Sequence, residues 1–191
     1  MIGNDIVDLK LASMESNPLR PGFLEKIFSV LELRSLDNST KLITDIWLYW
    51  AMKEAAYKAH QRRFSLLRRF NPQKFIVTGI CPQTRDSGKV IVDGYQYYCQ
   101  NVITKEFIHS TATGGDIAAN FETIFCPPRE IRSTLRERLA QVLSIKSREL
   151  CLEKDNNFVP QIIHRGLGLP IPFSLSHHGS YGAFSFQLMN Y

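Results

Sequence analysis

Hydrophobic and polar positions along the chain follow patterns that separate helices from strands. Apolar residues recur at helical spacing from Phe23 to Leu33, which predicts an amphipathic helix broken near Ser29. The segment from Lys41 to His60 is rich in Ala, Leu, Lys and Glu and contains no Gly or Pro, so it predicts a long helix. A third helix is expected from Arg129 to Leu143, opened by Pro127-Pro128.

Shorter runs rich in β-branched and aromatic residues predict strands. One opens the chain, from Ile2 to Leu9, and a further set of strands is expected after the third helix. Turns are expected at Asp86-Ser87-Gly88 and at Gly114-Gly115-Asp116. Between the long helix and the third helix we expect an antiparallel meander with strands at Lys74 to Ile80, Lys89 to Gln100, Asn101 to Thr111 and Asn120 to Phe125.

These elements predict an α+β protein built from two lobes. The first half runs strand, helices, sheet, and the second half runs helix, sheet, so a boundary is expected near Cys126. The division is into residues 1–126 and 127–191, which together form one functional unit. With 191 residues and 44% hydrophobic content, the chain can bury a sizeable core.

The net charge of +5 indicates an acidic partner, which could be nucleic acid, an anionic cofactor or an acidic protein. Much of the excess lies in Arg62, Arg63, Arg68 and Arg69. We interpret this cluster either as a solvated helix end or as a patch for phosphate or an acidic partner.

Cysteine spacing and the hydrophobicity profile predict a soluble, cytoplasmic protein. The four cysteines are widely spaced without a C-x-x-C pair, so we expect free, buried thiols and no zinc site. Asp5 lies where a secretory signal would carry basic and then apolar residues, and no stretch reaches the roughly 18 apolar residues of a membrane span.

The long helix carries a carboxylate among aromatic residues. Five positions spaced by three or four residues share one stripe of its surface: Trp47, Trp50, Ala51, Glu54 and Lys58. Glu54 and Lys58 could be an ordinary helix pair worth roughly 0.2–0.5 kcal/mol. A carboxylate on a stripe that faces protein nevertheless needs a cation or several donors. A metal ion would meet that need, and Asp5 could supply the second carboxylate of a magnesium site that also uses waters and substrate phosphates.

A second candidate site lies near the C-terminus, in Ser174-Leu175-Ser176-His177-His178-Gly179. A strand that ends in Ser and His before a Gly-rich turn offers hydroxyl, imidazole and backbone N–H donors to an anion. A serine hydrolase is disfavoured because Ser176 and His177 point to opposite faces of a strand and no G-x-S-x-G surrounds the serine. Walker A and dinucleotide motifs are missing from the sequence. The residues alone therefore predict a magnesium-dependent phosphate or pyrophosphate site.

Three motifs in this order resemble the 4′-phosphopantetheinyl transferase superfamily. They are Gly3-Asn4-Asp5-Ile6-Val7-Asp8-Leu9, the helix Trp50-Ala51-Met52-Lys53-Glu54-Ala55-Ala56-Tyr57-Lys58, and Ser174-Leu175-Ser176-His177. Their order, with Phe23-Leu24-Glu25-Lys26-Ile27-Phe28 between the first two, is similar to that of the small holo-acyl-carrier-protein synthases, which are trimers of shorter chains. The stretch that begins at Arg129 resembles the front half of the larger, two-lobed transferases. The resemblance thus implies a transferase-like pseudo-dimer with its lobes in swapped order and one active site at their junction. A monomer is the favoured form, with a trimer, as in the small synthases, as the alternative.

The resemblance also implies an activity and roles for individual residues. The phosphopantetheine group of coenzyme A would pass to a serine of an acidic acyl or peptidyl carrier protein, as in fatty acid biosynthesis, with release of 3′,5′-adenosine bisphosphate. Asp5 and Glu54 would hold Mg²⁺, Lys53 and Lys58 would contact phosphates, and Ser176 with His177 would bind the nucleotide end. Catalysis would rest on Glu54, Lys58 and Asp5. The role of Asp8 stays open.

Two other functions compete with this prediction. The same carboxylates could serve another magnesium-dependent enzyme that hydrolyses phosphate esters. The chain could also be a non-catalytic module that binds a carrier protein or nucleic acid, although it carries no recognisable nucleic-acid motif, so nucleic acid is not an expected partner. Candidate residues for docking an acidic carrier are Arg20, Arg62, Arg63, Arg68 and Arg69.

Overall fold

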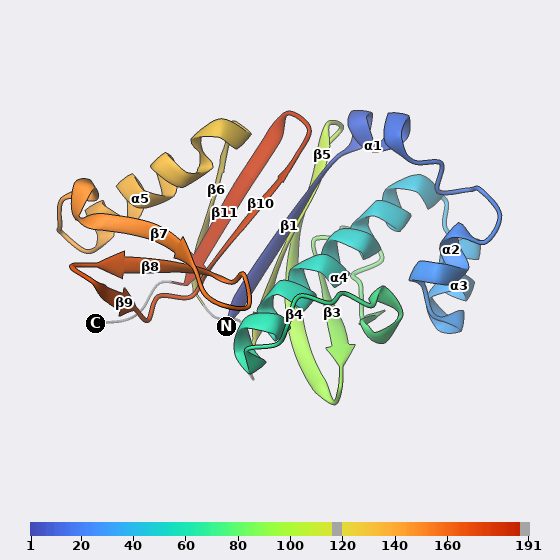
Figure 1. The fold of residues 1–191 in the computed structure, drawn as a ribbon. Coiled ribbons are helices and arrows are strands. Elements are labelled where there is room, and N and C mark those ends of the chain that lie inside the picture. Colours follow the sequence, from blue (N-terminus) through green and yellow to red (C-terminus); the bar gives the residue numbers. More distant parts are fainter. Residues whose placement is uncertain (116–119, 188–191) are drawn as a thin grey trace.

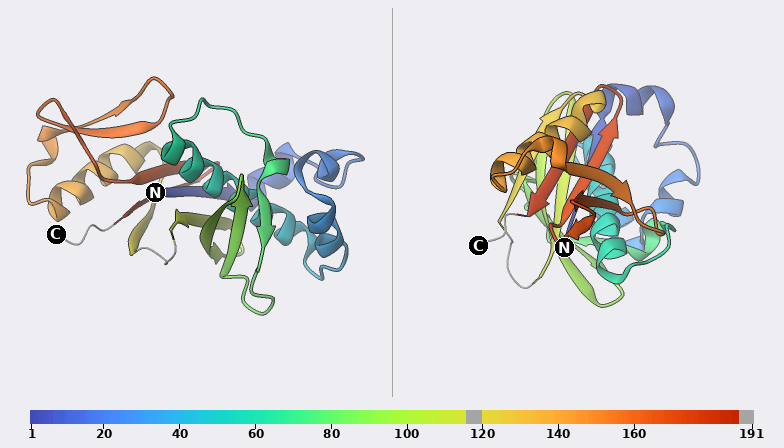
Figure 2. Two further views of the ribbon diagram at one scale, coloured as in Figure 1. Left: turned by 90° about the horizontal axis from the view of Figure 1, so that it is seen from below. Right: turned by 60° about the vertical axis from the view of Figure 1, so that its left-hand side comes forward.

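Two lobes lie side by side along the molecule, and the N-terminal strand runs between them (Figure 1 and Figure 2). The computed structural model describes residues 1–115 and 120–187. The protein is of the α+β class, as expected, and its strand pairs are antiparallel. The α-helices are α1 (Leu9–Glu15), α2 (Phe23–Ile27), α3 (Val30–Asp37), α4 (Leu42–Phe64) and α5 (Ile131–Val142).

The described strands form three sheets, with the orders β1-β5-β4-β3-β2, β10-β11-β6 and β7-β8-β9. The first sheet contains β1 (Ile2–Asp8), β2 (Ile76–Thr78), β3 (Ser87–Val92), β4 (Tyr95–Ile103) and β5 (Phe107–Gly114). The second contains β6 (Phe121–Cys126), β10 (Phe173–His178) and β11 (Tyr181–Gln187). The third contains β7 (Leu150–Lys154), β8 (Pro160–His164) and β9 (Leu167–Leu169).

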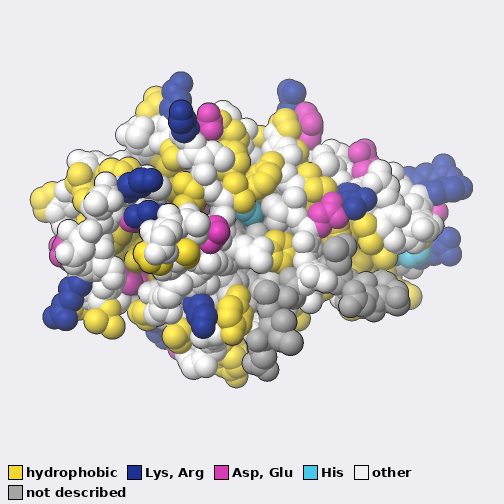
Figure 3. Space-filling view, turned by 180° about the vertical axis from the view of Figure 1, so that it is seen from behind, with side chains coloured by type: hydrophobic (Ala, Val, Ile, Leu, Met, Phe, Trp, Pro, Cys, Tyr) yellow, Lys and Arg dark blue, Asp and Glu magenta, His cyan; other side chains and the backbone are white. Residues whose placement is uncertain are grey.

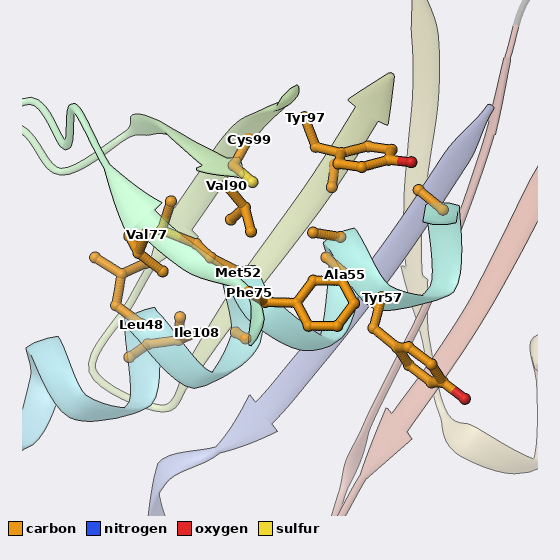
Figure 4. Close-up of a cluster of buried hydrophobic side chains, with 14 of the residues drawn as sticks. Leu48, Met52, Ala55, Tyr57, Phe75, Val77, Val90, Tyr97, Cys99 and Ile108 are labelled. Carbon is orange, nitrogen blue, oxygen red and sulfur yellow. The ribbon is translucent and has the colours of Figure 1, made fainter. Parts of the chain in front are cut away.

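The long helix α4 packs across one face of the first sheet, as Figure 4 shows for the side chains between them. Residues Leu48, Met52, Ala55 and Ala59 of α4 are completely buried. Gly3 lets β1 approach the helix closely, because a Cβ at this position would clash with the carbonyl oxygen of Ala55 and lie 2.6 Å from the backbone nitrogen of Ala59. The site residues of β1 and α4 are therefore held at short range.

The expected break near Ser29 is confirmed, and its cause is a capping box. Ser29 caps α3: its hydroxyl accepts a hydrogen bond from the Glu32 amide, and the Glu32 carboxylate accepts one from the Ser29 amide at 2.7 Å. The helix therefore restarts in a new direction, and α2 and α3 form a small cluster against the start of α4.

The strand boundaries within the meander were wrong. A turn at Asp93 and Gly94, both with positive φ, ends β3, and β4 continues through residue 103. The strand expected at 89–100 is thus a hairpin, and the next chain reversal lies at 104–106. Strand β3 already begins at Ser87, where a turn was expected, and Asp116 of the other expected turn lies outside the described residues.

Strand β6 was also misplaced in the meander. It pairs with β11 in the second sheet, and Arg138 of α5 donates to Glu122 of β6 at 2.7 Å. Helix α5 packs on this sheet through Ile131, Leu135 and Leu139, so in each lobe a helix packs against an antiparallel sheet. The division of the chain at residue 126 stays a prediction, and the pairing of β6 favours a boundary before it.

None of the described helices is long and apolar enough to cross a membrane. All four cysteines are free, as expected. Only Cys99 is buried, whereas Cys151 is exposed, so the expectation of buried thiols holds for one of the four.

Candidate active site

The two lobes meet where the free edge of β1 faces β10. Side chains of β10, not its backbone, satisfy the edge of β1: the Asn4 amide donates to Ser174 Oγ at 2.9 Å, and the Asp8 amide donates to His178 Nδ1 at 3.0 Å. Ser174, Ser176 and His178 alternate along β10 and share one face. The Ser-His strand is thereby brought beside the N-terminal Asp motif, about 170 residues away in sequence.

Asp5 of β1 and Glu54 of α4 lie in one pocket of about 540 Å³ at this junction, together with Lys58, Ser176 and His177. Lys58 bridges the two elements, since its Nζ donates to Asp5 Oδ1 at 2.8 Å and to the Asn4 carbonyl at 2.9 Å. We call this cavity the carboxylate pocket. Its lining also includes the apolar residues Phe23, Ile27, Trp47 and Trp50.

The pKa values of both carboxylates are raised above their usual range. Burial, reinforced by the charge of Asp5, raises the pKa of Glu54 to about 7. Burial also raises the pKa of Asp5, although the ammonium of Lys58 opposes that shift. Among the described residues no side chain or backbone group donates a hydrogen bond to the Glu54 carboxylate. The Glu54 carboxylate is therefore buried without a hydrogen-bond donor, and a bound cation would supply a partner for it.

A second pocket, of about 450 Å³, continues the cleft beyond Glu54 and Lys58. Four polar residues line both pockets: Glu54, Lys58, Arg68 and His177. Its other charged lining residues are Arg62, Arg132 and Lys154. Five cations thus surround one carboxylate, and we call this cavity the basic pocket. Its chemistry suits a ligand that carries several phosphate charges.

Two cations of the basic pocket were not singled out from the sequence, whereas Arg62 and Arg68 belong to the expected arginine cluster. Arg132 lies on α5 and Lys154 on β7 of the second lobe. Arg62 of α4 packs over the Phe173 ring and donates to the Pro160 carbonyl at 3.1 Å, and burial lowers its pKa to about 10. The sequence shows that the segment after Arg129 is basic. It does not show where this segment lies relative to α4.

Lys53 lies away from both pockets. Its side chain is fully buried, and its Nζ donates to Glu32 Oε2 at 2.8 Å and to the carbonyls of Ile27 and Pro72. The three ammonium protons thus have three acceptors. The structure does not bring Lys53 to the cleft, because it points about 100° around the helix from Glu54 toward α2 and α3.

Asp8 has a structural position. Its carboxylate caps α1 through the Leu11 amide and also accepts from the Ser180 amide, both at 3.0 Å. Burial acts to raise its pKa, but backbone hydrogen bonds outweigh burial and lower it. Asp8 therefore ties β1 to the β10–β11 turn next to the site, and it does not line either pocket.

His178 was missed as a partner of the Asp motif. Its Nδ1 accepts from Asp8, and its Nε2 lies 3.3 Å from a carboxylate oxygen of Glu15, so the proton belongs on Nε2. The exposed His177, one residue earlier, points to the other face of β10 and lines both pockets.

The expected arginine patch is divided in the structure. Arg62 is engaged within the cleft, Arg63 stacks over Tyr95, and Arg68 and Arg69 are exposed. Of these, Arg68 lines both pockets. The cluster is therefore partly a lining of the cleft and partly free surface.

The donor set fits Mg²⁺. Asp5 and Glu54 supply two carboxylates in one pocket, and the cleft leaves room for phosphate oxygens and water, which is how proteins commonly hold this ion. Within the described residues, no group of three or more His, Cys, Asp or Glu side chains is arranged to hold a metal. The protein ligands of such a site would thus be the two carboxylates of Asp5 and Glu54.

The fold and the site together define the class of protein: an α+β protein with two carboxylates in a cleft between its lobes. A family model described as the 4′-phosphopantetheinyl transferase superfamily matches residues 1–112, and the chain belongs to this superfamily. The matched region contains Asp5, Glu54 and Lys58, whereas Ser176 and His177 lie outside it. No curated protein matches the chain.

Proposed function

We propose that the protein transfers 4′-phosphopantetheine from coenzyme A to a serine of an apo acyl or peptidyl carrier protein, in the manner of a holo-acyl-carrier-protein synthase. Membership of the superfamily supports phosphopantetheinyl transfer in general. The observation that carries the finer proposal is the cleft itself, which joins two carboxylates, an apolar rim and a strongly basic pocket.

The basic pocket is the proposed site of the nucleotide end of coenzyme A. The 3′-phosphate and the pyrophosphate carry several negative charges, and Arg62, Arg68, Arg132 and Lys154 surround this end of the cleft. Lys58, between the two pockets, lies where it can contact the pyrophosphate. Ser176 and His177 offer further donors from β10. Lys53 is left out of the proposed site, because its protons are already used.

The pantetheine arm and the carrier serine would then lie at the carboxylate pocket. Its apolar lining by Phe23, Ile27, Trp47 and Trp50 suits an uncharged arm. Mg²⁺, held by Asp5 and Glu54, would supply positive charge to the pyrophosphate and to the leaving group. The lining at this end of the cleft also includes Glu15, the last residue of α1, and Ser16 directly after it.

The reaction forms one bond and breaks one. The carrier serine Oγ attacks the phosphorus nearest the pantetheine, and the bond from that phosphorus to the bridging oxygen breaks, which releases 3′,5′-adenosine bisphosphate. Lys58 and the arginines stabilise charge on the leaving group. Glu54 accepts the serine proton directly or through water. Lys58 also holds the Asp5 carboxylate in place.

Coenzyme A and an acidic carrier protein are the proposed partners, and Arg20, Arg63 and Arg69 are exposed candidates for docking the carrier. We also propose a cytoplasmic location. Because one chain brings both halves of the cleft together, the proposed form is a monomer, for which light scattering should give the mass of one chain.

Product analysis separates this proposal from its rivals. The protein is incubated with coenzyme A and Mg²⁺, with and without an apo carrier protein, and free 3′,5′-adenosine bisphosphate is measured by chromatography. We expect release only with carrier and metal, and at least a hundredfold slower release by Asp5→Asn and Glu54→Gln. Glu106→Gln, at an exposed position outside the cleft, is the matched control and should keep full activity.

Other outcomes identify other functions. Release without carrier would indicate a hydrolase of phosphate esters. Tight binding of carrier without any release would indicate a binding module. On the face drawn in Figure 3, several Lys and Arg side chains lie beside Asp or Glu, so this face gives little support to a nucleic-acid module.

A further inference from the structure

Asn4 is completely buried at the point where the two lobes meet at the cleft. Its backbone amide donates to Ser174 Oγ of β10, and its carbonyl accepts from Lys58 Nζ of α4, both at 2.9 Å. Its side chain extends from β1 toward β10 and β11, on the opposite side of the strand from Asp5. Asn4 thus contacts both lobes without lining either pocket.

The side-chain nitrogen of Asn4 makes three contacts. It lies 2.9 Å from Ser176 Oγ, 3.2 Å from His109 Nε2 and 3.3 Å from the Ala183 carbonyl oxygen. A carbonyl oxygen can only accept, so this contact assigns the atom as the amide nitrogen. Burial and the charge of Lys58 lower the pKa of His109 to about 3 and keep the ring neutral, and because the amide nitrogen can only donate, Nε2 is the accepting nitrogen of that ring. The amide therefore donates to Ser176 Oγ.

This hydrogen bond fixes what the Ser176 hydroxyl can do. Because Ser176 Oγ accepts from Asn4, its own proton must point elsewhere, and among the described residues no acceptor contacts it. Ser176 lines the carboxylate pocket, which is where that proton can find an anionic oxygen. We propose that Asn4 is a positioning residue that orients the Ser176 hydroxyl to donate to a phosphate oxygen of coenzyme A.

The unsatisfied oxygen of Asn4 supports this role. Asn4 Oδ1 is buried without a hydrogen-bond partner among the described residues, which lowers stability. An apolar side chain would fill the same space without leaving a polar atom unpaired. The presence of an amide side chain at this position is thus better explained by its hydrogen bond to Ser176 Oγ than by packing. The inference rests on the proposed function and adds a residue to it.

A double-mutant cycle tests the proposal. The dissociation constant of coenzyme A with Mg²⁺ is measured by calorimetry for the full-length wild type, Asn4→Ala, Ser176→Ala and the double variant. We expect Ser176→Ala to weaken binding about tenfold and Asn4→Ala about three- to tenfold, since hydrogen bonds to charged groups are the stronger ones. In the Ser176→Ala background, Asn4→Ala should change the constant less than twofold. The KM for coenzyme A should rise in Asn4→Ala, with kcat nearly unchanged.

Thr111→Val is the matched control. Thr111 Oγ1 makes a similar buried hydrogen bond between the lobes, to Ser185 Oγ at 3.1 Å, and lines neither pocket of the cleft. It should keep wild-type affinity for coenzyme A even if its melting temperature falls as much as that of Asn4→Ala. If Asn4→Ala does not fold, Asn4→Ser, whose side chain is one bond shorter, replaces it in the cycle.

Each contrary outcome has a distinct meaning. Equal losses from Asn4→Ala in both backgrounds, or a matching loss in Thr111→Val, would overturn the positioning role while leaving the transferase proposal intact. If the folded wild type neither binds coenzyme A nor transfers its phosphopantetheine, the positioning role and the proposed function both fail.

Discussion

At the scale of single residues, two lysines five positions apart on α4 do different work. Lys58 donates a hydrogen bond to Asp5 in the carboxylate pocket and is part of the proposed site. Lys53 forms a buried ion pair with Glu32, whose carboxylate also accepts hydrogen bonds from the amides of Ser29 and Val77. The pair therefore fastens α3 to α4 and β2. A single motif thus contributes one residue to the proposed site and one to the structure.

The two lysines can be separated by experiment. Lys53→Met should lower the free energy of unfolding by about 3–5 kcal/mol, because it leaves the buried Glu32 carboxylate without its cation. Affinity of the folded protein for coenzyme A should stay the same. Lys58→Met, the matched control, should weaken binding of coenzyme A about tenfold or more with a smaller loss of stability. Urea unfolding and calorimetry provide the two measurements, and the reverse pattern would return Lys53 to the site.

The sequence predicted part of this site on physical grounds. Glu54 lay on an aromatic stripe, which indicated a buried carboxylate in need of a cation, and the structure places it between Trp50 and Lys58 in the cleft. Asp5 was already a candidate for the second carboxylate of a magnesium site from the residues alone, and the family resemblance implied the same pair. The place of Lys53 could not be inferred, because it depends on Glu32 in a helix whose direction is set by a capping box.

At the scale of elements, the site depends on the close contact of β1 with α4. Asp5 and Glu54 belong to these two elements, and Gly3 provides the space that allows them to approach. The strand, the long helix and the broken helix were predicted from local pattern. The meander was predicted less well, because the Asp93-Gly94 turn was overlooked and the partner of β6 is set by long-range pairing.

Gly3→Ala tests this contact. The added methyl group would meet the backbone of α4 at Ala55 and Ala59, so β1 must shift, at a cost of about 1–3 kcal/mol in the free energy of unfolding. Transfer activity should fall with it, since Asp5 moves away from Glu54. Gly168→Ala is the control, because its nearest neighbour would be Ile163 Cδ1 at 3.9 Å. Wild-type stability and activity in Gly3→Ala would show that the close approach is not required.

At the scale of the whole molecule, the second lobe supplies what the matched region lacks. Residues 1–112 carry the carboxylates, and the later chain brings Arg132, Lys154, Ser176 and His177 to the same cleft. The two-lobed α+β architecture was predictable from the order of elements. The contact between the edge of β1 and β10 was not predictable, because these strands are joined by hydrogen bonds to side chains of β10 and not by backbone pairing.

The most direct test of the central claim is the intact mass of an apo carrier protein after incubation with this protein, coenzyme A and Mg²⁺. The account predicts a gain of one phosphopantetheine, lost when EDTA removes the metal and when the carrier serine is replaced by alanine. An unchanged carrier mass across acyl and peptidyl carriers, from folded protein that binds coenzyme A, would contradict it.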